Sequence, residues 1–213
     1  MNEPAPAIPA TCEDRPTIGG LVRPWVNIEL ADGGLDFRVQ HRGRAEQSIT
    51  RQLCQVCGKK LRRPIVLLGE AHHLRRLMFV EPPLHPECAV YTSHACPMVA
   101  GRMTHHPGRA TLSEGPRGAT CPTDGCNCGG WVNHNPSQRT EDRPAEPWYA
   151  VYVAAYSHAR DQNGSLLVLT TPAAVLRVRL VSRPGEGRVW ISVNDALKDY
   201  QAPEFHTSPG GDS

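Results

Sequence analysis

Four cysteine and histidine residues in the middle of the chain constrain its fold more than any other feature. Cys54 and Cys57 are separated by two residues, and His85 and Cys88 repeat this spacing 28 residues after Cys57. Zinc binds four sulfur or nitrogen donors in a tetrahedron, and each of these pairs can supply two donors from one turn of backbone. The spacing therefore predicts one structural zinc site with these four residues as ligands.

The residues around the two pairs fit the local geometry of such a site. Gly58 follows the first pair, where a knuckle backbone often needs the positive φ that glycine adopts at low cost. Pro86 and Glu87 lie inside the second pair, and both suit the first turn of a helix. Two apolar runs between the pairs, Ile65–Leu68 and Leu77–Val80, are placed to form a hairpin. A knuckle, a hairpin and a ligand-bearing helix together are the layout of a treble-clef zinc finger.

A fifth donor competes for the four positions. Cys96 lies eight residues after Cys88. On a continuous helix this separation is about two turns, or roughly 12 Å of rise, which is too far for one ion. Pro97 indicates that the helix ends near this point, so Cys96 stays open as a substitute for His85. The alternative interpretation of all these cysteines is buried thiols or disulfide partners.

The termini and the cysteine content bear on the cellular compartment. The start of the chain, MNEPAPAIPATCEDRP, lacks the apolar core of a signal peptide. No apolar run approaches the length that spans a membrane. These features predict a cytoplasmic protein without membrane contact. Because thiols stay reduced there, eight cysteines in 213 residues favour metal ligands over disulfides.

A second group of cysteines lies in a region with almost no aliphatic residues, 99–147. Cys121, Cys126 and Cys128 fall within eight residues of one another. A fourth donor could come from His105, His106 or His134, and His134 is the one we assign to a possible second metal site. A metal would order a segment that cannot form an apolar core. The alternative is an irregular insertion with incidental cysteines, because this spacing is less specific than two paired motifs.

Hydrophobic patterning predicts the remaining elements. Residues 44–53 carry Ala45, Ile49 and Leu53 at helical spacing. Asp32-Gly33 between two short apolar segments predicts a hairpin over 25–39, which can join either part of the chain. After residue 148, alternation and β-branched residues predict an antiparallel meander with strands at 148–156, 165–170, 174–181 and 188–193. Asn194 is then expected to cap a short helix over 195–200.

The predicted fold class is α+β, with a treble-clef-like zinc module packed against a small antiparallel sheet. The expected parts are an extended or disordered arm (1–23), a zinc-binding module (24–98), an irregular insertion (99–147), the meander with its helix (148–200) and a disordered tail (201–213). Cys12 lies in the arm, where we expect a free thiol; the alternative is that it folds back to a metal.

Positive charge gathers around the first cysteine pair. Residues 38–76, here called the basic face, contain ten basic and two acidic residues, whereas the net charge of the whole chain is +2. The basic residues are Arg38, Arg42, Arg44, Arg51, Lys59, Lys60, Arg62, Arg63, Arg75 and Arg76. Such a block can contact the phosphates of nucleic acid. The alternative is a solvated arginine-rich surface beside a metal–thiolate centre.

Several motifs resemble those of a family of uncharacterised proteins from GC-rich bacteria and their bacteriophages. They are RPW at 23–25, DFRV at 36–39, LCxxCG at 53–58, EPPxHxxCAxY at 81–91 and ACP at 95–97. The resemblance covers about residues 20–100 and implies a metal-bound core without implying a reaction. The chain departs from the family pattern at the pair His72-His73 and at the cysteine-bearing segment 121–128.

Two functional hypotheses follow from the sequence. The first is a zinc-stabilised binding protein whose partner is nucleic acid, contacted through the basic face, or a host or phage protein. The second is an HNH-like metal-dependent nuclease, with His72 or His73 on the hairpin as general base and His94 on the helix as a ligand of a catalytic metal. A solvated histidine pair is the alternative, since the hairpin asparagine usual in such nucleases and a nearby carboxylate pair are both lacking. We therefore expect a protein that is not an enzyme.

Overall fold

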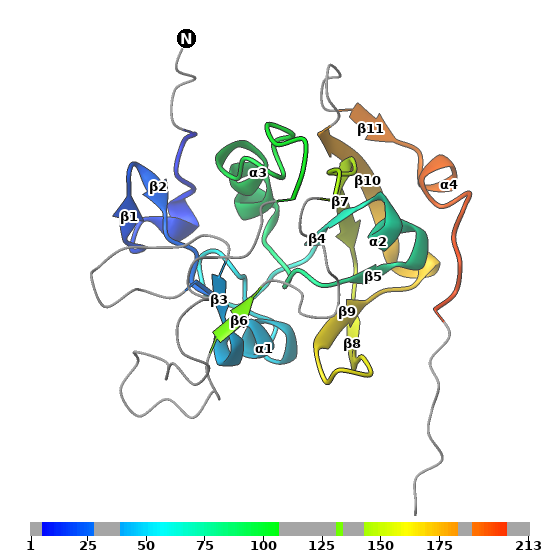
Figure 1. Cartoon of the computed structure of the whole chain (residues 1–213), viewed down its shortest axis with the longest axis horizontal. Helices are drawn as coiled ribbons and strands as arrows, with labels where there is room; N and C mark the ends of the chain where they lie inside the picture. The colour runs from blue at the N-terminus through cyan, green and yellow to red at the C-terminus, as the bar shows by residue number, and fades with distance from the viewer. Residues whose placement is uncertain (1–5, 28–38, 107–130, 134–142, 183–188, 204–213) are drawn as a thin grey trace, which may run out of the picture.

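The computed structural model describes residues 6–27, 39–106, 131–133, 143–182 and 189–203. Within these residues the fold is mixed α+β with antiparallel sheets, as the sequence predicts (Figure 1). The proposed second metal site, Cys121, Cys126, Cys128 and His134, lies outside the described residues, as does most of the predicted hairpin over 25–39. In the part of the chain that is described, no helix has both the length and the apolar character needed to cross a membrane.

The largest sheet has four strands in the order β11-β10-β7-β4, all antiparallel. Strand β4 (Ile65–Glu70) pairs residue for residue with β7 (Trp148–Val153). Strand β7 continues the sheet to β10 (Val175–Ser182), which pairs with β11 (Val189–Ile191). All six residues of β4 are buried, so both of its faces are covered, which explains its unbroken apolar run.

A second sheet has three strands in the order β5-β9-β8. Strands β8 (Ser157–Arg160) and β9 (Leu166–Leu169) form a hairpin, and β5 (Met78–Phe79) pairs with the other edge of β9. The Asp161 side chain accepts hydrogen bonds from the backbone N–H groups of Asn163 and Ser165, which holds the hairpin turn.

The hairpin predicted from the runs at 65–68 and 77–80 is wrong. The first run lies in the four-stranded sheet and the second in the three-stranded sheet. Helix α2 (Ala71–Arg76) separates them, and Leu77 ends this helix in the left-handed conformation with φ 48°. A treble clef is therefore not confirmed, although its knuckle and its helix are present.

The single meander predicted after residue 148 is also wrong. Strands β8 and β9 leave the sheet that contains β7, β10 and β11 and join β5 instead. Strand β8 was not predicted separately, because its residues are mostly polar and exposed and give no apolar alternation.

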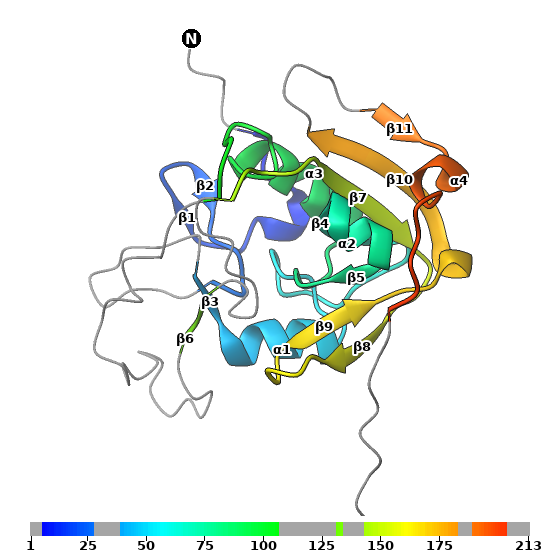
Figure 2. The same cartoon turned by 45° about the vertical axis from the view of Figure 1, so that its right-hand side comes forward.

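Helix α1 (Arg42–Thr50) confirms the helix predicted over 44–53, and its N-cap is His41. Helix α3 (Pro86–Ala95) begins where the His-Pro-Glu-Cys motif predicts. The last helix, α4 (Val193–Ala196), begins before the predicted range and is capped by Ser192, not by Asn194, because the Ser192 hydroxyl accepts from the Asp195 N–H. Helix α2 lies beside β4 and β7, and α4 lies beside β10 (Figure 2).

Residues 6–22 were expected to be an extended or disordered arm, but they fold onto the rest of the chain. They form the short helix η1 (Ala10–Cys12) and the hairpin of β1 (Thr17–Ile18) and β2 (Leu21–Val22). The backbone N–H of Val22 donates to the hydroxyl oxygen of Tyr91 at 2.8 Å, which ties this hairpin to α3. The remaining small sheet pairs β3 (Val39–His41) with β6 (Trp131–Asn133).

Candidate metal centre

A tight backbone turn presents the first two donors. The N–H of Gly58 donates to the carbonyl of Cys54 at 2.8 Å, and the N–H of Cys54 donates to the carbonyl of Lys59 at 2.9 Å. Gly58 has φ +75°, and a β-carbon added there would lie 2.7 Å from the ring of Trp25. Both the backbone conformation and the available space therefore require glycine at this position, as the sequence suggests.

The start of α3 presents the other two donors. His85 is the N-cap of α3, Pro86 occupies its first turn, and Cys88 lies two residues after Pro86. Leu84, just before the cap, exchanges two backbone hydrogen bonds of 2.9 Å with Val66 of β4. The helix start is therefore fixed against the central sheet.

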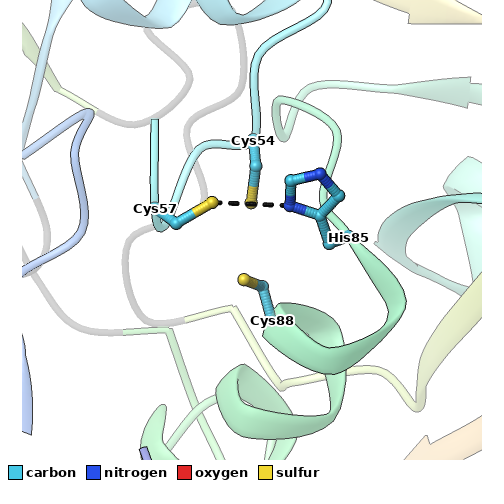
Figure 3. Close-up of side chains that lie close together, drawn as sticks. All are labelled: Cys54, Cys57, His85 and Cys88. Carbon is cyan, nitrogen blue, oxygen red and sulfur yellow. Dashed lines mark hydrogen bonds between the residues drawn. The ribbon is translucent and has the colours of Figure 1, made fainter. Parts of the chain in front are cut away.

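Together these elements bring Cys54, Cys57, His85 and Cys88 into one group, here called the metal centre (Figure 3). Their four donor atoms all lie within 4.8 Å of one another, and none of the four residues is more than 5% exposed. The Cys57 sulfur is 3.4 Å from Nδ1 of His85. Metal–sulfur bonds of about 2.3 Å and metal–nitrogen bonds of about 2.0 Å give a tetrahedral edge of roughly 3.5 Å, which fits this separation.

The histidine ring is held with its free nitrogen toward the sulfurs. Nε2 of His85 lies 2.9 Å from the carbonyl oxygen of Lys60, and a carbonyl can only accept, so Nε2 carries the proton. Nδ1 is then the nitrogen that faces Cys57, and it is left to bind a metal, which displaces any proton held there. A backbone acceptor that fixes the tautomer in this way is the usual outer-shell partner of a metal-binding histidine.

The charges at the centre call for a cation. Hydrogen bonds from neighbouring thiols, that of Cys12 first, lower the pKa of Cys57. Contacts with the same group of sulfurs, again Cys12 first, raise the pKa of Cys88. Hydrogen bonds to Cys54 and Cys57 raise the pKa of His85 to about 10. One thiolate is therefore favoured and a second beside it is opposed, and a divalent cation among the donors would remove that opposition.

The cysteines outside the metal centre differ from their predicted roles. Cys96 is the C-cap of α3 and is not part of the group, because the helix continues to Ala95 and keeps Cys96 about two turns from Cys88. Cys12 forms no disulfide, but it lies beside the metal centre and not in an extended arm: it is 1% exposed and its sulfur lies 3.8 Å from that of Cys88. Seventy-six residues separate this pair. No local spacing in the sequence could have revealed the contact.

A second group of potential metal ligands contains Glu70, His72 and His73, here called the Glu70 group. Glu70 ends β4 and forms a capping box with His73, in which each side chain binds the backbone of the other residue. Both histidines lie in α2, so the predicted hairpin position for them is wrong. His94 lies in the last turn of α3 and belongs to neither group of metal-capable residues that is described.

The Glu70 carboxylate is saturated by donors. It is 2% exposed and accepts from the N–H of His73, from Arg143 and from the N–H of Glu146 at 3.1 Å. Nε2 of His106 lies 2.8 Å from Oε1 of Glu70, and it donates because a carboxylate can only accept. Four donors use the lone pairs that a metal would need. Sequence reasoning missed this arrangement, because three of the four donors lie far along the chain from Glu70.

Glu70 connects two chain segments that lie far from it in the sequence. Residues 104–106 and 143–146 run side by side, joined by hydrogen bonds of 2.9 Å from His106 N–H to the Arg143 carbonyl and from Ala145 N–H to the Thr104 carbonyl. Glu70 binds both segments, and Nδ1 of His72 lies 3.2 Å from the Glu146 carboxylate. The geometry is that of a buried ion-pair network that fastens these segments to the β4–α2 junction.

Comparison of the chain with protein-family profiles, with curated proteins and with solved structures found no match. The resemblance to the bacterial and bacteriophage family therefore stays a prediction. Functional conclusions rest on the geometry of the metal centre and on the exposed charges.

Proposed function

We propose that this chain is a zinc-stabilised binding protein whose partner is nucleic acid. Zinc is the metal that best suits three thiolates and one imidazole in a compact group. The observation that carries the proposal is the burial of all four donors, which leaves no open position for a water or a substrate. A closed donor set of this kind serves structure, whereas catalytic zinc keeps one position open.

The basic face supplies the contact surface in this proposal. Some of its cations are already neutralised by carboxylates: Lys59 pairs with Asp14 at 3.1 Å, and Arg62 pairs with Glu87 at 3.5 Å. Others form no ion pair among the described residues and are exposed: Arg51, Lys60, Arg63, Arg75 and Arg76. Three of them, Arg51, Lys60 and Arg63, lie within six residues of Cys54 or Cys57 in the sequence.

Charge removal beside the knuckle is expected to weaken nucleic-acid binding. Each cation that contacts a phosphate contributes about one unit to the slope of log affinity against log salt. The double variant Lys60→Gln/Arg63→Gln should therefore bind more weakly to all sequences and reduce that slope by about 2. Salt-dependent fluorescence anisotropy with labelled DNA and RNA oligonucleotides measures both quantities.

The matched control removes the same charges elsewhere. Arg177→Gln/Lys198→Gln replaces one exposed arginine and one exposed lysine on β10 and after α4. This variant should show the same slope of log affinity against log salt as the wild type. An equal loss in both variants would place the contact outside the basic face. A wild-type response that is flat with salt would indicate instead a host or phage protein as the partner.

The alternative function is an HNH-like nuclease, which the closeness of Glu70, His72 and His73 favours. The four donors to Glu70, one of which is the guanidinium of Arg143, oppose a metal at that place. We expect no nicking of supercoiled plasmid with magnesium or manganese present. Nicking that disappears in His72→Ala/His73→Ala would replace the binding function with this one.

A further inference from the structure

The metal centre has a neighbour that its four ligands do not include. Helix η1 places Cys12 in the core, 1% exposed, with its sulfur 3.8 Å from the Cys88 sulfur. The adjacent Thr11 hydroxyl lies 3.4 Å from the same Cys88 sulfur. Two consecutive side chains of the N-terminal segment therefore contact one metal-binding sulfur.

The separation of the two sulfurs is that of two ligands on one ion. Two metal–sulfur bonds of about 2.3 Å at the tetrahedral angle place their sulfur atoms roughly 3.8 Å apart. The Cys12 and Cys88 sulfurs are at this distance already. Cys12 therefore approaches the centre beside Cys88, whereas His85 approaches it beside Cys57, with Nδ1 at 3.4 Å from the Cys57 sulfur.

From this arrangement we propose that Cys12 is a reserve ligand, which gives the metal centre a second, all-sulfur mode of binding. The inference rests on the proposed metal centre, but not on nucleic-acid binding. Zinc is held by the three cysteines and His85. A more thiophilic divalent cation, such as cadmium, is held by Cys12, Cys54, Cys57 and Cys88, and His85 is released.

The chemistry of the donors supports two modes. Soft cations prefer thiolates over imidazole, whereas zinc accepts both. His85 is the only nitrogen donor in the centre, and its ring keeps a backbone acceptor at Lys60 whether or not Nδ1 binds a metal. Exchange of Nδ1 for the Cys12 sulfur would draw that sulfur closer to the other donors, because Cys12 contacts Cys88 but is not among the four residues whose donor atoms lie within 4.8 Å of one another.

Ultraviolet charge-transfer absorbance of the full-length protein tests the proposal, since its intensity rises with the number of bound thiolates. With cadmium, Cys12→Ser should lose about a quarter of the absorbance of the wild type, as four thiolates become three. With cobalt in the zinc mode, the two proteins should absorb equally. Cys96→Ser is the matched control and should match the wild type with both metals, because Cys96 lies outside the group.

Wild-type protein alone gives a second readout, which does not depend on the folding of a variant. The ¹¹³Cd chemical shift of the cadmium-loaded protein should fall in the range of four sulfur ligands. A shift typical of three sulfurs and one nitrogen, or equal cadmium absorbance in wild type and Cys12→Ser, would overturn the proposal. A wild-type protein that binds neither zinc nor cadmium would instead overturn the metal centre itself.

Discussion

Cys88→Ser is expected to abolish cooperative folding of the protein. Cys88 is fully buried, and a metal bound to it would join the first turn of α3 to the knuckle at Cys54 and Cys57. Binding of structural zinc contributes about 10–16 kcal/mol in zinc-finger peptides, whereas a domain is stable by only about 5–15 kcal/mol in total. Loss of the ion should therefore cost more than the whole free energy of unfolding of the domain. Circular dichroism during thermal unfolding, with zinc content by elemental analysis, measures both effects.

Cys96→Ser provides the matched control for this prediction. It makes the same chemical change at the other end of α3, outside the metal centre. This variant should retain about one zinc per chain and melt close to the wild type. A chelator should reproduce the Cys88→Ser behaviour in the wild type, and added zinc should reverse it. A Cys88→Ser protein that melts cooperatively at the wild-type temperature would show that the ion does not hold the fold.

The metal centre could be predicted because its signal is local. Two donors three positions apart can share an ion whatever the rest of the chain does, so the pairs Cys54/Cys57 and His85/Cys88 carry their geometry with them. The helix start at Pro86 is local in the same sense. Each of these predictions depends on residues within one turn of backbone.

The strand pairing could not be predicted, because an apolar run does not specify its partner. Ile65–Glu70 is buried on both faces, so it lacks the alternation that distinguishes an inner face from an outer one. It pairs with Trp148–Val153, some 80 residues away, and not with the nearby run at Met78–Phe79. The hexapeptide between the two runs, Ala71–Arg76, is helical because Glu70 caps it, which a search for hairpins overlooks.

Contacts between residues far apart in the sequence could not be predicted at either candidate site. Cys12 is 76 residues from Cys88, and Arg143 is 73 residues from Glu70. No periodicity or spacing in the sequence predicts either contact. A single carboxylate at the end of an apolar strand was nevertheless a usable signal, since Glu70 could be buried only with partners for its charge.

Glu70→Ala is expected to cost about 3 kcal/mol of folding free energy. Breaking a buried ion pair by removing one partner typically costs about 3–5 kcal/mol, because the other charge is left without compensation. The lower end applies here, since the Arg143 side chain is 33% exposed and water can partly solvate it. The loss also frees residues 104–106 and 143–146 from the β4–α2 junction. Urea denaturation followed by fluorescence measures the change.

Glu46→Ala is the control for a carboxylate at the surface. Glu46 pairs with Arg42 and Arg160, but its side chain is 32% exposed, so its removal should cost no more than about 1 kcal/mol. An equal loss of stability in the two variants would mean that burial of Glu70 adds nothing. If Glu70→Ala is as stable as the wild type, the ion-pair network does not stabilise the packing of residues 104–106 and 143–146.

Acid should act on the same network through protonation of Glu70. Burial raises the pKa of this carboxyl, but the hydrogen bonds and charges of His106 and Arg143 and the N–H of Glu146 outweigh burial, and the net pKa lies below its usual 4.5. A lowered folded-state pKa means that the stabilisation is complete above the unfolded-state pKa and is lost as the pH falls through the folded-state value. Glu70→Gln cannot titrate, so the stability difference between wild type and this variant should shrink below about pH 4.5. A difference that stays constant from pH 7 to pH 3 would show that the ionised carboxylate is not what holds the two segments.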